Sequence, residues 1–171
     1  MRLPHESITL ADGRDYQVRP LNSGDVRRLQ AFFYSHTDET ISFRYGAPLN
    51  EMTRGRALEL VGVDQESDVA LALVAQDGPL ETIHAVARYY RDPDRESAEF
   101  AVVVDERRRR LGIARLLLQR LQGIAAAQGL SHLWAQVDVA NQPIRRLLRS
   151  LGGLEDTPEE GTVYVRIPVA D

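Results

Sequence analysis

Hydrophobic residues along the chain follow two different periods. Short runs of branched or alternating apolar residues predict β-strands, and apolar residues three and four positions apart predict amphipathic helices. The order is a strand, helices, three strands, a helix, a strand, a helix and a last strand. The predicted strands lie within 16–21 (YQVRPL), 68–79 (DVALALVAQDGP), 81–94 (ETIHAVARYYRDPD), 97–105 (SAEFAVVVD), 132–139 (HLWAQVDV) and 162–169 (TVYVRIPV).

Helices are predicted between these strands, with recognisable ends. Residues 22–36 begin with an Asn or Ser N-cap, residues 51–62 form a short helix, and residues 141–153 run from Asn141 to a Gly–Gly pair. The longest helix covers about 18 residues from near Leu111, and Gly129 ends it. Because neighbouring strands are joined by short turns, we expect an α+β or mixed α/β fold around a mostly antiparallel sheet.

Length and composition narrow the class of protein. The 171 residues suit one domain, 1–171, and the net charge of −4 argues against a dedicated nucleic-acid binder. Cysteine is absent, which excludes disulfides and thiolate catalysis. No signal peptide or membrane-spanning run is visible, so we expect a cytoplasmic protein that does not bind membranes. All 21 basic residues are arginine, which reflects either codon usage or an enzyme that avoids modifying its own lysines.

The segment "DERRRRLGIARLLLQRL" joins the strand 97–105 to the longest helix. The N-terminus of a helix presents unpaired backbone N–H groups and the positive end of the helix dipole. Gly112 and Ala114 would let an anion approach these groups closely, and the arginines add charge. Neither a Walker loop nor the dinucleotide-binding glycine pattern is present. The alternatives are a solvated start of a basic helix and a nucleic-acid patch, which Asp105 and Glu106 oppose.

This segment resembles motif A of the GCN5-related N-acetyltransferases (GNAT), whose core is [QR]-x-x-G-x-[GA]. The resemblance implies that the backbone amides of the turn bind the pyrophosphate of acetyl-CoA and that the pantetheine arm lies along the preceding strand. The family often has glycine where Arg110 stands. The implied acetyl-CoA-binding residues here are Val102, Val103, Val104, Arg109, Arg110, Leu111, Gly112, Ile113, Ala114 and Arg115.

A second family motif follows in "WAQVDVANQPIRRLLRSLGG". Asn141 matches the asparagine that contacts the CoA arm, and Gly152 matches a late glycine. Leu148 stands where many members carry the tyrosine that protonates the leaving thiolate, so no general acid is implied there. The resemblance implies the GNAT fold, with a twisted, mostly antiparallel sheet of six to seven strands and about four helices. Segments such as "AEFAVVV" are also similar to the bacterial protein-lysine acetyltransferase (Pat-like) subgroup.

Acetyl transfer to an amine needs a neutral amine, and a carboxylate base can take its proton. Glu99 is the candidate, because it lies on the strand leading to the turn, alternates with Phe100 and is flanked by apolar residues. The Pat-like subgroup carries its base at the matching glutamate; the other interpretation is a polar residue on a solvated sheet face. Weaker candidates for the acid, the base or substrate contacts are Arg44, Tyr45, His84, Tyr89, Tyr90, Asp138, Arg145, Arg146 and Arg149.

We therefore expect an acetyl-CoA-dependent N-acetyltransferase that works by direct transfer, without metal, as a monomer or homodimer. The expected acceptor is an amine, with a protein lysine side chain ahead of a small molecule. Backbone N–H groups around Val102 would polarise the thioester. The alternatives are a small-amine acetyltransferase, including one for aminoglycoside-like substrates, and a non-catalytic acyl-CoA sensor.

Overall fold

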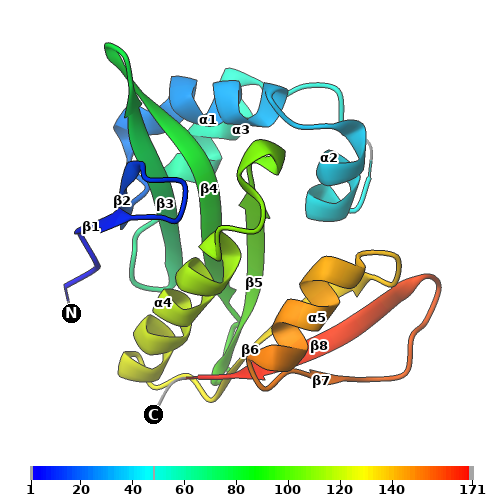
Figure 1. Ribbon diagram of the computed structural model, residues 1–171. Helices are drawn as coiled ribbons and strands as arrows, with labels where there is room; N and C mark the ends of the chain where they lie inside the picture. The colour runs from blue at the N-terminus through cyan, green and yellow to red at the C-terminus, as the bar shows by residue number, and fades with distance from the viewer. Residues whose placement is uncertain (1, 48, 170–171) are drawn as a thin grey trace.

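The computed structural model of the chain describes residues 2–47 and 49–169. Eight strands form one sheet in the order β1-β2-β3-β4-β5-β6-β8-β7 (Figure 1). The strands are β1 (Glu6–Thr9), β2 (Asp15–Pro20), β3 (Asp68–Asp77), β4 (Leu80–Arg91), β5 (Ser97–Val104), β6 (His132–Asp138), β7 (Leu154–Glu155) and β8 (Thr162–Pro168). The α-helices are α1 (Val26–Tyr34), α2 (Asp38–Tyr45), α3 (Arg54–Val61), α4 (Ile113–Ala127) and α5 (Gln142–Ser150).

The predicted fold class is confirmed, and the element count is slightly higher than expected. Among the described residues, the sheet has eight strands instead of six or seven, and there are five α-helices instead of about four. The additional elements are short. β1 pairs with β2 through a turn closed by a hydrogen bond from Leu10 N to Arg14 O (3.1 Å), and β7 has only two residues. Short elements carry too few apolar positions to show a period.

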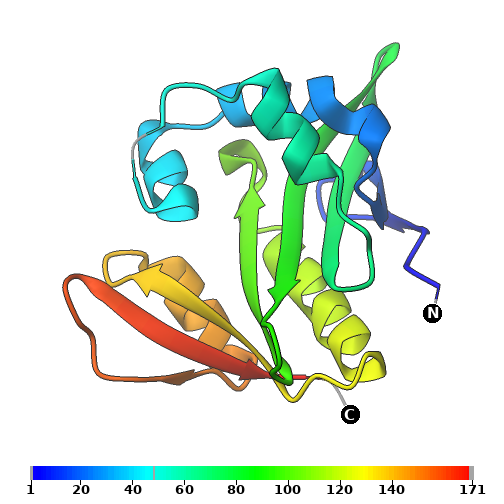
Figure 2. The same ribbon diagram turned by 180° about the vertical axis from the view of Figure 1, so that it is seen from behind.

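Two apolar layers cover the two faces of the sheet. α4 packs on one face, over β4, β5 and β6, where Leu117, Leu118 and Leu121 are fully buried. α1 and α3 pack against each other on the opposite face (Figures 1 and 2). Phe32 and Phe33 of α1 are buried there with other apolar residues. No helix among the described residues is long and apolar enough to cross a membrane.

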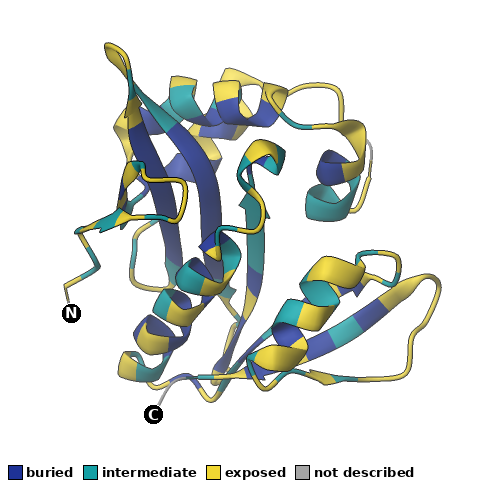
Figure 3. Ribbon diagram, in the orientation of Figure 1, coloured by how far each residue is buried: buried dark blue, intermediate teal, exposed yellow. Residues whose placement is uncertain are grey.

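The sheet opens between β5 and β6. These strands run parallel and pair only over Ser97–Glu99 with His132–Trp134, after which they diverge (Figure 1). The second half of β5 is therefore only partly buried, in contrast to β3 and β4 (Figure 3). α2 packs beside this half of β5, and α5 lies over β6 and β8 on the far side of the opening.

Candidate active site

The turn between β5 and α4 presents unpaired backbone amides at the opening. Gly112 precedes α4 with φ +74°, and the first hydrogen bond to the turn runs from Leu116 N to Gly112 O (3.0 Å). The amides of Ile113, Ala114 and Arg115 therefore have no helical acceptor and point beyond the N-terminus of the helix. α4 is shorter than the predicted 18 residues, because Leu111 and Gly112 belong to this turn.

Arg110 adopts a left-handed backbone with φ +67°. A residue with a β-carbon pays about 1–2 kcal/mol in this region, whereas glycine pays almost nothing. This left-handed backbone explains why the family often carries glycine at this position. The present chain adopts the same conformation with an arginine. Arg110 is exposed, so its side chain adds positive charge beside the amides.

The other arginines of the run are tied to fixed partners. Arg107 Nε donates to Asp105 Oδ1 (3.1 Å), and Arg108 donates from Nη1 to Asp105 Oδ2 (3.1 Å) and from Nε to Tyr16 Oη (3.1 Å). Arg109 Nη2 donates to Thr40 Oγ1 of α2 (3.0 Å). Arg107, Arg108 and Arg109 therefore hold the turn to its surroundings by hydrogen bonds and ion pairs. They do not form a continuous free patch for nucleic acid.

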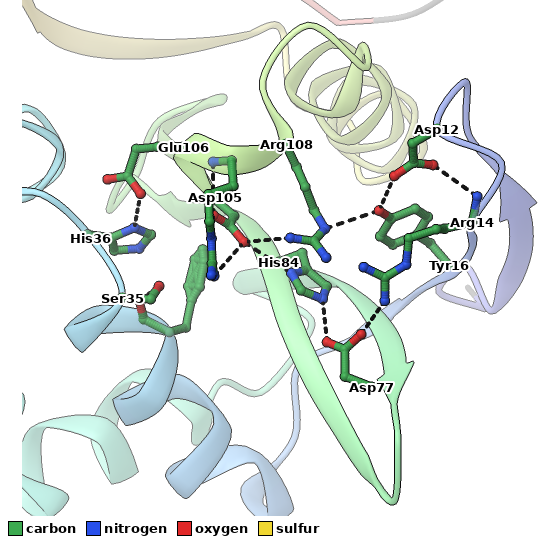
Figure 4. A network of polar contacts seen from close by, with 12 residues as sticks. Asp12, Arg14, Tyr16, Ser35, His36, Asp77, His84, Asp105, Glu106 and Arg108 are labelled. Carbon is green, nitrogen blue, oxygen red and sulfur yellow. Dashed lines mark hydrogen bonds and ion pairs between the residues drawn. The ribbon is translucent and has the colours of Figure 1, made fainter.

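Asp105 is the centre of the polar network in Figure 4. His84 lies between its Oδ2 (3.3 Å) and Asp77 Oδ2 (3.0 Å), and both His84 and Asp105 are buried. Burial alone would raise the pKa of Asp105, but hydrogen bonds from Arg107 and His84 outweigh it and lower this pKa to about 2. Asp105 therefore stays ionised at neutral pH and fixes the start of the turn.

Glu106 connects the same turn to the segment before α2. Its Oε1 accepts a hydrogen bond from Thr37 N (2.8 Å), and its Oε2 lies 3.6 Å from His36 Nδ1 (Figure 4). Burial is the main cause that lowers the pKa of His36, which favours the neutral ring. Together with Arg109, Glu106 holds α2 beside the opening.

The second half of β5 offers backbone groups to the opening. Asp105, an odd-numbered residue, donates from its N to His84 O on β4 (2.8 Å). Glu96, an even-numbered residue, accepts with its O from Ser131 N, next to β6 (2.7 Å). Because strand residues alternate, even-numbered residues of β5 direct their backbone groups toward β6. Strand pairing with β6 ends at Glu99, so the amides of Val102 and Val104 face the opening without a strand partner, while the Val103 side chain packs toward α1.

α5 supplies the far wall of the opening. Asn141 caps the helix, with Oδ1 accepting from Ile144 N (3.5 Å), and it stays partly exposed. Arg115 Nη2 of α4 donates to Ser150 Oγ of α5 (2.7 Å) and so connects the two helices. Leu148 is fully buried in the core, so the position where many relatives carry tyrosine holds an apolar side chain here.

Glu99 lies at the last paired position before the opening. Tyr90 of β4 and Trp134 of β6 stand directly opposite it, and its side chain is on the α1–α3 side of the sheet, away from buried Phe100. The expected alternation with Phe100 is therefore confirmed. The expected apolar environment is wrong, because Glu99 is exposed: the diverging strands leave this face without a covering element.

Several weaker candidates lie away from this point or have other partners. The bulge between β3 and β4 falls at His84, which is held between two carboxylates. Tyr89 is buried on the α4 side and donates to Gln128. Asp138 caps its own turn by accepting from Ala140 N (2.8 Å), and Arg145 pairs with Glu155 (2.9 Å). Arg146 and Arg149 are exposed on α5, with Arg149 3.7 Å from Glu155.

One notable residue was missed by the sequence analysis. Arg88 is 2% exposed in the middle of β4, although its neighbours predicted only an apolar strand. Arg44 and Tyr45, named as acceptor-side candidates, line a small cavity with it, together with His36. The sequence signal was available, because a charged residue at an otherwise buried strand position is unusual.

Comparison with known proteins agrees with this geometry. The model of the acetyltransferase (GNAT) family matches residues 26–152. An acetyltransferase of Pseudomonas aeruginosa is 28% identical over 164 residues, which cover 94% of this chain and 87% of that protein.

Solved structures show the same fold. The GNAT domain of S. lividans PAT superposes with a TM-score of 0.85 at 24% identity, over 98% of this chain and 99% of that one. Spermidine N-acetyltransferase from Vibrio cholerae, solved with CoA and spermine, gives a TM-score of 0.67 at 16% identity, over 89% and 93%. Since the family model covers most of the sequence and the opening has the corresponding turn, this chain belongs to the acetyltransferase (GNAT) family.

Proposed function

We propose that the protein transfers the acetyl group of acetyl-CoA directly to an amine at the opening between β5 and β6, with Glu99 as the general base. One observation carries the proposal. The strand that bears Glu99 leads, through unpaired amides at Val102 and Val104, to the free amides at the start of α4. A base, a carbonyl-binding strand and a pyrophosphate site thus follow one another along a single segment.

Acetyl-CoA fits the donors of this segment. Its pyrophosphate would accept hydrogen bonds from the amides of Leu111, Gly112, Ile113, Ala114 and Arg115, at the positive end of α4. Arg109 and Arg110 supply charge beside them. The pantetheine amides would pair with the free backbone of Val102–Val104, as an added strand does. Asn141, partly exposed across the opening, would contact the same arm.

The chemistry follows from where these groups lie. The Val102 amide can donate to the thioester oxygen and stabilise the negative charge that develops there. An amine approaching from the α1–α3 side meets Glu99, which removes the proton that would otherwise hold the nitrogen as an unreactive ammonium. The new C–N bond forms as the C–S bond breaks, and CoA leaves as the thiolate, which takes up a proton.

Base catalysis matters here because a free lysine amine, with a pKa of about 10.4, is neutral in only about one molecule in 2,500 at pH 7. A lysine side chain of a protein is the acceptor that the sequence resemblance to the Pat-like subgroup suggests. The fold itself does not distinguish a protein acceptor from a small amine. A non-catalytic sensor is less well supported, because an exposed carboxylate, Glu99, lies on β5 three residues before Val102.

Calorimetric titration with acetyl-CoA, and separately with NAD as a nucleotide control, tests the cosubstrate. We expect micromolar binding of acetyl-CoA and none of NAD. Release of free CoA thiol is then followed with lysine peptides and small amines. Binding without turnover on any amine would favour a sensor, and absence of acetyl-CoA binding would overturn the proposal.

A further inference from the structure

Arg88 is a buried cation without a negatively charged partner among the described residues. Its Nη1 donates to Leu60 O (3.1 Å) and to Tyr90 Oη (2.9 Å), both of them uncharged acceptors. Its Nε is buried and has no hydrogen-bond partner among the described residues. An arginine guanidinium is not deprotonated in proteins, so this group carries a positive charge. A charged group that is 2% exposed therefore lacks the counter-ion that burial normally requires.

Arg44 of α2 lines the same cavity, and it also has no carboxylate partner in the part of the chain that the structure describes. Its guanidinium stacks on the Tyr45 ring at 4.7 Å from the centroid. Burial, and next the positive charge of Arg88 among other groups, lowers its pKa, although the arginine remains charged. Two like charges thus share one small space between α1, α2, β4 and β5.

The other poorly exposed arginines of this chain form ion pairs with carboxylates. The side chains of Arg19 (12% exposed), Arg108 (14%) and Arg145 (16%) each form an ion pair with an aspartate or glutamate. Within residues 2–47 and 49–169, no ion pair includes Arg44 or Arg88. The missing partner is therefore specific to this cavity.

The cavity lies on the acceptor side of the opening. Arg88 and Tyr90 are on the same face of β4, and Tyr90 stands directly opposite Glu99. Val103, whose backbone neighbours are the free amides of Val102 and Val104, lines the cavity as well. A molecule whose amine reaches Glu99 would therefore extend toward the two arginines.

We propose that the acceptor is a small primary amine that also carries a carboxylate, and that Arg44 and Arg88 bind this carboxylate. The inference rests on the proposed function, and it selects the small-molecule acceptor over a protein lysine. A guanidinium presents its donors in a planar fork that matches a carboxylate. The cavity volume of about 20 Å³ holds about one water-sized group, which suits a carboxylate oxygen better than a tetrahedral phosphate.

A matched series of acceptors tests the proposal. The ω-amino acids from glycine to 6-aminohexanoate are compared with their carboxamides, at saturating acetyl-CoA, by release of CoA thiol. We expect kcat/KM for the best acid to exceed that of its carboxamide by about 10-fold or more, as loss of a charged hydrogen bond would predict. In Arg44→Gln this ratio falls toward one, whereas in Arg27→Gln, an exposed arginine of α1, it is retained.

Direct binding is measured independently of turnover. The Nε–H signals of the ¹⁵N-labelled protein are followed during titration with sodium acetate at constant ionic strength. We expect saturable shifts of the Arg44 and Arg88 signals, the first identified by its loss in Arg44→Gln. The Arg88 shift should weaken in that variant, and Arg88→Lys, if it folds, should abolish acetate binding.

The outcomes separate the two proposals. Equal turnover of acids and carboxamides, or arginine signals that do not respond to acetate, would overturn the carboxylate site and leave the acetyltransferase proposal intact. Failure to bind acetyl-CoA in the calorimeter would overturn the proposed function, and with it this inference.

Discussion

The two sides of the opening between β5 and β6 offer different parts of the chain to a charged ligand. On the α4 side, the donors are backbone amides of one continuous segment, and Arg107 and Arg109 near them are held by Asp105 and Thr40. On the acceptor side, the donors are the side chains of Arg88 on β4 and Arg44 on α2, which have no carboxylate partner within residues 2–47 and 49–169. Arg107 and Arg109 near the turn therefore have protein partners, whereas the two arginines on the acceptor side lack a negatively charged partner among the described residues.

This difference fits the two ligands. The proposed pyrophosphate site can tolerate many side chains, because it would use backbone groups that almost any residue supplies. The acceptor site depends on particular side chains, and each of them is a point where relatives can differ. Specificity in this protein is therefore expected to reside in Arg44, Arg88 and Glu99.

The largest expected effect is the loss of the base. Glu99→Gln should lower kcat by about 10²-fold, because proton removal by a positioned carboxylate contributes at least that much. Acetyl-CoA affinity, measured by calorimetry, should stay within about twofold, since Glu99 is on the acceptor side. Glu96→Gln, an exposed glutamate just before β5, is the control. An unchanged pH–rate profile in Glu99→Gln would remove Glu99 as the base.

The next effect is on the cosubstrate side. Gly112→Glu should weaken acetyl-CoA binding at least about 10-fold, because it places a carboxylate beside the pyrophosphate and strains a backbone at φ +74°. Gly123→Glu introduces the same side chain on an exposed, ordinary position of α4 and should leave binding intact. Calorimetric titration of both variants decides; equal affinities would contradict the pyrophosphate assignment.

The network that holds the turn gives a pH-dependent prediction. The folded pKa of Asp105 is about 2, below its usual value near 3.9, so its contribution to stability is present above pH 4 and is lost as the pH falls toward 2. This depression corresponds to about 2–3 kcal/mol. Asp105→Asn should lower the free energy of unfolding by about that amount at pH 7.

Urea denaturation at pH 7 and at pH 3 measures this effect. The difference in the free energy of unfolding between the wild-type protein and Asp105→Asn should shrink at pH 3. At that pH the carboxyl group is mostly protonated in the unfolded chain, whereas the folded protein holds it ionised. Asp156→Asn, at an exposed position, provides the comparison. A difference that is the same at both pH values would show that Asp105 acts by packing and not by charge.

The smallest expected effect concerns the backbone of the turn. Arg110→Gly should raise the free energy of unfolding by up to about 1 kcal/mol, since it relieves a left-handed conformation at some cost in unfolded-state entropy. Arg110→Ala retains the β-carbon and should bring no gain. Thermal denaturation of the three proteins compares them, and a gain in Arg110→Ala would assign the effect to the side chain.

Local patterns in the sequence were sufficient for most of the fold. The long strands, the helix that ends at Gly129 and the turn at Gly112 were all predicted, because each depends on residues near one another in the chain. The position of Glu99 before the turn was predicted for the same reason. β1 and α2 were missed, because their few residues show no clear apolar period.

By itself, the sequence determined the segment that we propose to bind acetyl-CoA through its backbone, because a strand, a glycine-containing turn and a helix start follow in order from 97 to 115. Only the tertiary structure decided which side chains meet at the acceptor side. Arg44 and Arg88 come from a helix and a strand that are separated by α3 and β3 in the chain. The two arginines meet in one buried cavity because of how the helices and strands pack. The local spacing of residues along the chain does not encode this packing.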